Sequence, residues 1–122
     1  MPRVVHFEIA IDEPERAVAF YREAFGWQIE KWDGPMDYWL VKTGEPGEMG
    51  IDGGLTPRAD AAAPIVNTIG VDSVDAYQAK ITAAGGNVVM PKSALPGVGY
   101  FALCQDTEGN PFGILEPDMS AQ

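Results

Sequence analysis

The sequence predicts an α+β domain in which two βαβββ modules form a curved mixed sheet around a concave cavity. Three features predict this fold: an alternating strand at residues 3–12, an amphipathic helix directly after it, and a second copy of the pattern at a sequence offset of 60 (72 − 12 = 60). The 122 residues suffice for one domain with its own core. We therefore expect a single domain over residues 1–122, with modules at 1–57 and 64–118 and a linker at 58–63.

The first module opens with RVVHFEIAID, whose odd-numbered residues are mostly apolar while its even-numbered residues include His6 and Glu8. This alternation predicts a strand. Asp12, with Glu15 three residues later, predicts an N-cap and a capping box for a helix that ends at Gly26. Three further strand-like runs complete a β-α-β-β-β order, at residues 27–32, 37–42 and 49–55.

The second module repeats these signals at constant spacing. Its helix cap and stop signals, Asp72, Asp75 and Gly86, follow their first-module counterparts at one common offset (75 − 15 = 60; 86 − 26 = 60). The aromatic pair at residues 38–39 matches the pair at 100–101 at an offset of 62 (100 − 38 = 62). Four strands are expected, at residues 64–72 and in the runs NVVMP, GYFALC and PFGILE, with a hairpin turn at 108–110.

Each predicted helix can cover only one face of its strands. The odd-numbered apolar residues of the first strand should face the helix, which leaves His6 and Glu8 on the other face. Two modules joined edge to edge would share a concavity on that second face. A small ligand is expected to bind there.

Composition excludes several functional classes. The net charge of −10, from 18 acidic and 8 basic residues, repels nucleic acids and anionic membranes, so neither is an expected partner. Cys104 is the single cysteine, which excludes an intrachain disulfide. The sequence has no 18-residue apolar run and no signal-peptide pattern at its N-terminus, so a cytoplasmic location is expected.

The stretches HFEIAIDEPERAVAFYREAFGW, GPMDYWLV and GVGYFALCQDTEGNPFGILEPD resemble the vicinal oxygen chelate superfamily. That superfamily includes glyoxalase I, bleomycin-resistance proteins and extradiol dioxygenases. The similarity covers nearly the whole chain, and it is greatest to the branch of predicted lactoylglutathione lyase-related proteins. The resemblance implies the two-module fold described above and a homodimer.

The resemblance also implies a divalent metal held by one ligand from the first and the fourth strand of each module. His6 lies at the first of these positions, and its second-module equivalent is Val66, which cannot ligate. Gly113 stands where the last-strand glutamate is expected, and Asp52 is the only acid at residues 50–54. His6 is therefore a candidate metal ligand in an incomplete set, and a divalent metal is possible but not the favoured cofactor.

Glu8 lies two residues from His6, so both side chains project from the same face of one strand. The pair could bind one metal with waters, act as an acid–base pair, or line the pocket as polar groups. His6 and Glu8 are the candidate catalytic residues.

Aromatic residues and glycines complete the candidate ligand-binding site. One member of each aromatic pair must face the cavity, and Trp39 is the favoured wall, although the sequence leaves the strand register open. Glycines within strands leave room for a ligand or serve turn geometry. The candidate ligand-binding residues are Trp39, Tyr38, Gly53, Tyr100 and Gly113.

Two functions are compatible with these residues. The favoured function is a glyoxalase/bleomycin-resistance-like protein that binds a small molecule in the cavity without the full family metal site. Aromatic walls and an acidic surface suit a cationic or aromatic ligand. The alternative is a metal-dependent glyoxalase-like lyase or isomerase acting on a small oxygenated substrate, which would need a Lewis acid. Whether the protein is an enzyme stays open at this point.

Overall fold

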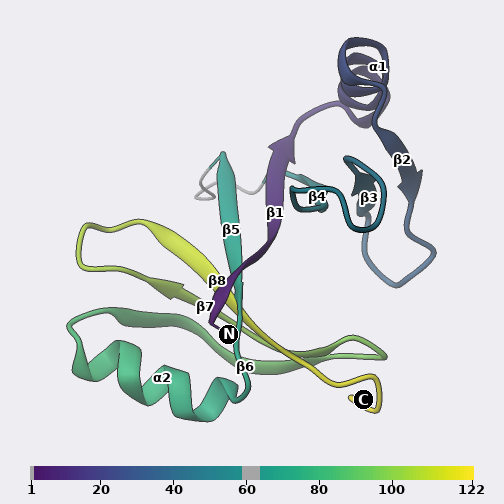
Figure 1. The fold of residues 1–122 in the computed structure, drawn as a ribbon. Coiled ribbons are helices and arrows are strands. Elements are labelled where there is room, and N and C mark those ends of the chain that lie inside the picture. Colours follow the sequence, from purple (N-terminus) through teal and green to yellow (C-terminus); the bar gives the residue numbers. More distant parts are fainter. Residues whose placement is uncertain (1, 59–63) are drawn as a thin grey trace. The chain divides into compact units, whose positions relative to one another are not determined.

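The computed structural model describes residues 2–58 and 64–122, which fall into two compact units (Figure 1). One unit holds residues 6–66, and the other holds residues 67–122 together with the first five. We call them the first and the second module. Most of the predicted linker, residues 59–63, lies outside the described residues.

The first module has the predicted β-α-β-β-β order. Its strands follow the spatial order β2-β3-β4-β1, in which β1 and β4 are parallel and the other neighbours are antiparallel. Its elements are β1 (Arg3–Ile11), α1 (Pro14–Phe25), β2 (Gln28–Lys31), β3 (Trp39–Lys42) and β4 (Gly53–Pro57).

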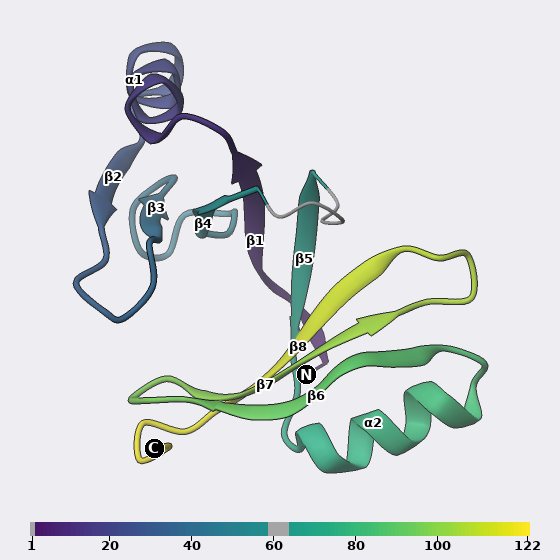
Figure 2. The same cartoon turned by 180° about the vertical axis from the view of Figure 1, so that it is seen from behind.

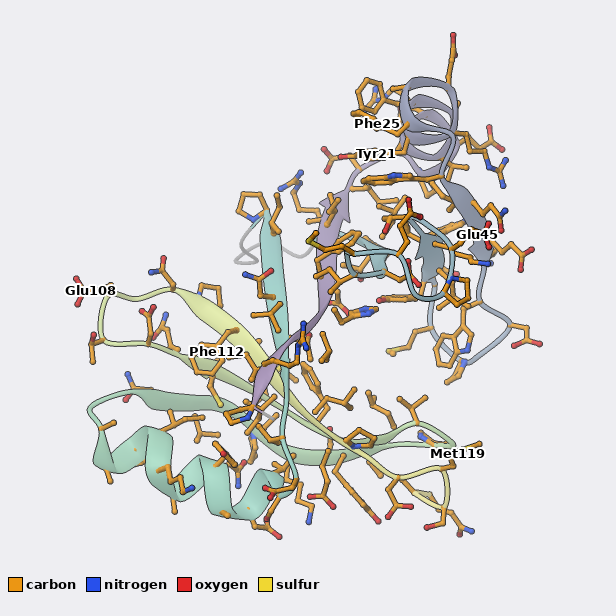
Figure 3. All side chains as sticks on the ribbon, viewed as in Figure 1. Tyr21, Phe25, Glu45, Glu108, Phe112 and Met119 are labelled. Atoms are coloured by element: carbon orange, nitrogen blue, oxygen red, sulfur yellow. The ribbon has the colours of Figure 1, made fainter. Side chains whose placement is uncertain are left out.

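The second module repeats this order. Its strands follow the spatial order β5-β8-β7-β6, with β5 and β8 parallel. Its elements are β5 (Ile65–Gly70), α2 (Val74–Ala83), β6 (Asn87–Leu95), β7 (Gly99–Gln105) and β8 (Pro111–Pro117). Both ribbon views show α2 running along the strands that it contacts, β6, β7 and β8 (Figures 1 and 2). Glu108 lies at the turn between β7 and β8, as the predicted hairpin requires (Figure 3).

Each helix begins differently from the sequence prediction. The N-cap of α1 is Glu13 rather than Asp12, and no side chain caps it. Pro14 occupies the first helical turn and has no N–H, so one of the donors that a cap would satisfy is missing. The carboxylate of Asp12 instead accepts a hydrogen bond from Arg58 Nε at 3.1 Å. The predicted capping box of α1 is therefore wrong.

In the second module, Ser73 rather than Asp72 caps α2, and its hydroxyl accepts a hydrogen bond from Ala76 N at 3.1 Å. The carboxylate of Glu116 on β8 accepts a second one, from Val74 N at 2.9 Å. A hydroxyl and a carboxylate from two elements thus take the place of the expected Asp72 cap.

The helix ends agree more closely with the prediction. Gly26 ends α1 in the left-handed conformation, with φ of 71°, and its N–H donates to Arg22 O. In α2 the positive φ falls on Gly85, at 101°, one residue before the predicted stop at Gly86.

Each module has its own hydrophobic core between its helix and its strands. The odd-numbered residues Phe7, Ile9 and Ile11 of β1 pack on the α1 side, as predicted. The core of the first module contains Ile11, Ile29, Val41 and Leu55, and that of the second contains Val71, Val74, Ala102, Cys104 and Ile114. Neither helix has the length and apolar character needed to span a bilayer, among the residues that the structure describes.

Candidate functional site

His6 and Glu8 lie on the face of the first module that points away from α1. Strand geometry fixes this position, because Phe7 between them packs in the core beneath the helix. The register pairs Glu8 with Gly54 on β4 and Gly54 with Leu40 on β3. These residues therefore form one row on the same face. His6 and Glu8 are both half-buried.

Tyr38, just before β3, lies across this row. A Cβ atom added to Gly54 would fall on the phenol group of Tyr38. The absence of a side chain at Gly54 therefore creates the space in which the ring lies. The Tyr38 hydroxyl reaches His6 Nε2 at 2.7 Å, and the two rings are nearly parallel, at 14°. Trp32 contacts the Tyr38 ring edge-on, with centroids 6.3 Å apart.

Burial and mutual contact shift the pKa values of all three groups. Burial lowers the pKa of His6 below its usual 6.5, and the charge of Asp52 opposes this shift only in part. Burial raises the pKa of Glu8, and the nearby Tyr38 hydroxyl opposes this shift. Burial and the charge of Glu8 both raise the pKa of Tyr38. At neutral pH the site therefore holds a neutral imidazole and a protonated phenol beside a carboxyl group that accepts a proton more readily than usual.

One hydrogen bond joins His6 to Tyr38, and the Glu8 carboxyl group lies near enough to the phenol to influence its pKa. The phenol has a single proton, so it either donates to His6 Nε2 or accepts from an Nε2–H while donating towards Glu8. The tautomer of His6 selects between these patterns. The three groups thus offer a bound molecule both donors and acceptors on a half-buried face.

The strand registers show which residues of the two modules are equivalent. Glu8 pairs with Gly54 in the first module, and its counterpart Thr68 (68 − 8 = 60) pairs with Gly113 in the second. A Cβ atom on Gly113 would meet the ring of Phe101, as one on Gly54 would meet Tyr38. Tyr38 therefore corresponds to Phe101 at an offset of 63 (101 − 38 = 63), which corrects the expected offset of 62.

This equivalence identifies the fourth-strand positions at which the resemblance implies metal ligands. They are Gly54 and Gly113, so Asp52 is not the equivalent residue, and its carboxylate accepts a hydrogen bond from Thr43 N at 2.8 Å. With Val66 at the third position, only His6 can donate to a metal. Within residues 2–58 and 64–122, no three His, Cys, Asp or Glu side chains gather as a metal site would require. The residues present do not fit the divalent metal that the resemblance implies.

Two of the five candidate ligand-binding residues lie on the faces opposite the helices. Tyr38 is one, beside His6, and Gly113 is the other, beneath Phe101. One residue of each aromatic pair therefore faces away from its helix, Tyr38 in the first pair and Phe101 in the second, so the favoured wall Trp39 and the candidate Tyr100 are both wrong. Trp39 packs on the α1 side with the core of the first module. Successive residues of an extended chain point to opposite faces, so placing Tyr38 beside His6 places Trp39 under the helix.

Gly53 and Tyr100 also lie on the helix sides of their modules. Gly53 pairs with Phe7, and a Cβ atom there would meet the Phe7 ring, so this glycine makes room for the core rather than for a ligand. Tyr100 packs against the core under α2, with Lys92 Nζ 4.6 Å from its ring centroid.

Sequence reasoning missed Gly54 and Trp32. The signal for Gly54 was available, because it stands next to Gly53 and neighbouring strand residues face opposite sides. Trp32 lies beyond the end of β2, and its N–H donates to Tyr38 O at 2.8 Å. No spacing rule places a residue of such a connection.

The two-module fold, the first-strand histidine and the closing turn together define a class of protein. The chain belongs to the Glyoxalase/Bleomycin resistance protein/Dioxygenase superfamily, whose sequence model matches residues 3–114. It is 32% identical over 113 residues to the proteins named "Putative glyoxylase CFP32" of Mycobacterium bovis and Mycobacterium tuberculosis. The match covers 90% of this chain but 42% of each relative, so the chain spans less than half of their length.

Solved structures agree with the fold. Methylmalonyl-CoA epimerase from Mycobacterium tuberculosis gives a TM-score of 0.71 at 15% identity, covering 94% of this chain and 87% of that one. A variant of the Streptomyces coelicolor epimerase in complex with 2-nitronate-propionyl-CoA gives 0.72 at 17% identity, covering 100% and 99%. These likenesses confirm the α+β class and the order of elements.

Proposed function

We propose that this protein binds a small oxygenated organic molecule on the face of the first module that carries His6, Glu8 and Tyr38, without the full family metal site. The observation that carries the proposal is the 2.7 Å hydrogen bond between His6 Nε2 and the Tyr38 hydroxyl. This bond lies on a half-buried sheet face rather than in the core. Binding sites commonly place a few polar groups of this kind among apolar and aromatic neighbours.

The chemistry of the three groups supports an oxygenated ligand. A neutral imidazole and a phenol can donate to or accept from carbonyl and hydroxyl oxygens, and the Glu8 carboxylate accepts from hydroxyl or ammonium groups. The net charge of −10 favours the approach of a cationic molecule. Among the similar structures, methylmalonyl-CoA epimerase is in complex with methylmalonyl-CoA, which gives a second class of molecule to test.

Trp32 provides a reporter for this face, because its ring contacts Tyr38. The test is a fluorescence titration with bleomycin, S-lactoylglutathione and methylmalonyl-CoA. We expect at least one compound to change the emission of the wild type and of Trp39→Phe but not of Trp32→Phe. Trp39 is the matched control, since it lies on the opposite side of the sheet. No response to any compound, or a response that Trp32→Phe retains, would argue against binding at this face.

The raised pKa of Glu8 favours a second function, proton transfer at a carbon next to a carbonyl group. A carboxylate with a raised pKa is a stronger base, and the adjacent Tyr38 and His6 could return the proton. The test is incubation of methylmalonyl-CoA in D₂O, with mass spectrometry of the recovered ester. Deuterium uptake that is lost in Glu8→Gln supports an enzyme, and uptake no faster than in buffer leaves a binding protein.

We also propose that the chain forms a homodimer, as the family resemblance implies, and that it is located in the cytoplasm. Light scattering of the purified protein tests the assembly, and a mass of one chain at micromolar concentration would contradict it.

A further inference from the structure

A hollow lies on the helix side of the first module, between α1 and the strands β2 and β3. Its volume is about 520 Å³. One side is formed by a face of α1 that includes Val18 and Arg22, and the other by Ile29, Lys31 and Trp39. All of these residues belong to the first module, and none belongs to the His6 face.

The floor of this hollow is apolar. Ile29 is fully buried, while Val18 and Trp39 pack partly on the same core. Lys31 and Trp39 are paired across β2 and β3, and the Lys31 ammonium lies 5.9 Å from the Trp39 ring centroid. The hollow therefore offers aliphatic and aromatic surface with a positive charge at its edge.

Arg22 adds a second positive charge with unused donors. Its guanidinium donates to Ile29 O, and a guanidinium has five N–H groups, so others remain free. Arg22 forms no ion pair with any residue in 2–58 or 64–122. Lys31 does pair with Asp37, but at 3.4 Å and with both side chains more than half exposed, an ion pair that holds the ammonium weakly. Both cations are thus available to an anion.

Arg22 and Lys31 lie at the same hollow although basic residues are few in this chain. The chain has 8 basic residues against 18 acidic ones, yet two of the basic residues line this one hollow. Among the described residues, Glu15 is the single acidic residue that lines the hollow. Its charge disfavours a ligand with a second negative group, so a monoanion suits the site better than a phosphate or a dicarboxylate.

We propose that the hollow between α1 and the β2–β3 edge binds an amphipathic monocarboxylate, with the carboxylate on Arg22 and Lys31 and the apolar body against Trp39 and Ile29. Arginine binds a carboxylate through paired N–H donors, which gives the head group a defined orientation. The aliphatic tail covers apolar surface that otherwise contacts water.

Sodium octanoate is the probe, titrated by calorimetry into the full chain. We expect octanoate to bind, and Lys31→Gln and Arg22→Gln each to weaken binding about tenfold, the loss expected for one charge-assisted hydrogen bond. Ala19→Trp, which fills the hollow from an exposed helix position, should abolish binding. Arg16→Gln is the matched control: it removes a positive charge from α1 at a residue that pairs with Glu13, and it should leave binding unchanged.

Circular dichroism verifies that each variant is folded. If Arg22→Gln does not fold, Lys31→Gln and Ala19→Trp still test the proposal. Three results would overturn the proposal: no octanoate binding up to about 10 mM, equal binding of 1-octanol, or undiminished binding in Ala19→Trp. Signals of Trp32 should not respond to octanoate, so the outcome is independent of ligand binding at the His6 face.

Discussion

Tyr38 lies across β4 because Gly54 leaves the backbone uncovered at that point, and its hydroxyl then reaches His6. In the family arrangement implied by the sequence, a ligating side chain would stand at the position of Gly54. Here the phenol of Tyr38, from the residue just before the neighbouring strand β3, takes that space and is the hydrogen-bond partner of His6. A hydroxyl that forms a hydrogen bond with His6 thus lies where the resemblance implies a metal ligand.

Tyr38→Phe removes the hydroxyl and keeps the ring. We expect a loss of about 1 kcal/mol in the free energy of unfolding, because His6 Nε2 loses a half-buried partner. The pKa of Glu8 should rise further, since the hydroxyl now lowers it. Urea denaturation measures the stability, and NMR titration of the Glu8 carboxyl carbon measures the pKa. A Glu8 pKa that stays constant or falls would contradict this placement of the hydroxyl.

Gly54→Ala tests the space under the ring. The added methyl group would overlap the phenol, so we expect a loss of about 1–3 kcal/mol in the free energy of unfolding. Tyr38→Ala removes the obstacle, and Gly54→Ala should cost much less in that background. The comparison is a double-mutant cycle measured by urea denaturation. Additive effects of the two substitutions would mean that the residues are not in contact.

The pH dependence of stability follows from the single histidine. Burial holds the pKa of His6 in the folded protein below the 6.5 expected in the unfolded chain. Below pH 6.5 the unfolded chain therefore binds more protons, and stability falls as the pH falls through this window. Glu8 acts in the opposite sense, because its raised pKa makes stability fall as the pH rises above 4.5.

His6→Gln separates the two effects, since it removes the contribution of the histidine to the pH dependence of stability and retains Glu8. Between about pH 7.5 and about pH 5.5, the wild type should lose more stability than the variant, measured as the shift in urea midpoint. Equal shifts in the two proteins would show that folding does not lower the His6 pKa.

At the scale of elements, the start of α2 depends on two acceptors from different parts of the second module. The Ser73 hydroxyl accepts a hydrogen bond from Ala76 N, and the Glu116 carboxylate accepts one from Val74 N. Because Glu116 lies on β8, the second bond ties the helix to that strand. Asp72, the residue that the sequence indicates as the cap, contributes neither bond. The spacing of residues in the sequence therefore did not identify which side chains cap this helix.

Ser73→Ala should destabilise the protein by about 1 kcal/mol, the usual effect of removing an N-cap hydroxyl. Asp72→Ala is the matched control, one residue earlier and exposed, and it should have a much smaller effect. Thermal and urea unfolding measure both. A larger loss in Asp72→Ala than in Ser73→Ala would restore the sequence-based assignment of the cap.

At the scale of the whole chain, the repeat made the architecture predictable. Apolar alternation, helical spacing and glycine stops recur at a constant offset in the two halves of the sequence, and they are sufficient to predict two βαβββ modules. The side of the sheet occupied by each aromatic residue was not predictable in the same way. A shift of one residue between strands moves a side chain to the opposite face, and the sequence left that register open.

The same argument explains which part of the candidate site could be predicted. His6 and Glu8 followed from alternation within one strand, and their placement opposite α1 is confirmed. Gly54 lies on β4 and Tyr38 just before β3, so their relation to His6 depends on strand pairing that only the structure supplies. Trp39 and Gly53 are each one residue away from a residue that lies on this face, so an open register is enough to put the prediction on the wrong side.

The His6 face, as we propose, binds an organic molecule through His6 and Tyr38 rather than a metal. Because the chain has one histidine, ¹⁵N NMR of the imidazole reports on this face alone. We predict that a bound compound from the test panel shifts the His6 Nε2 signal, and that equimolar Zn²⁺ or Ni²⁺ does not. Stoichiometric metal binding that shifts or broadens the His6 signal, with no response to any organic compound, would contradict the account.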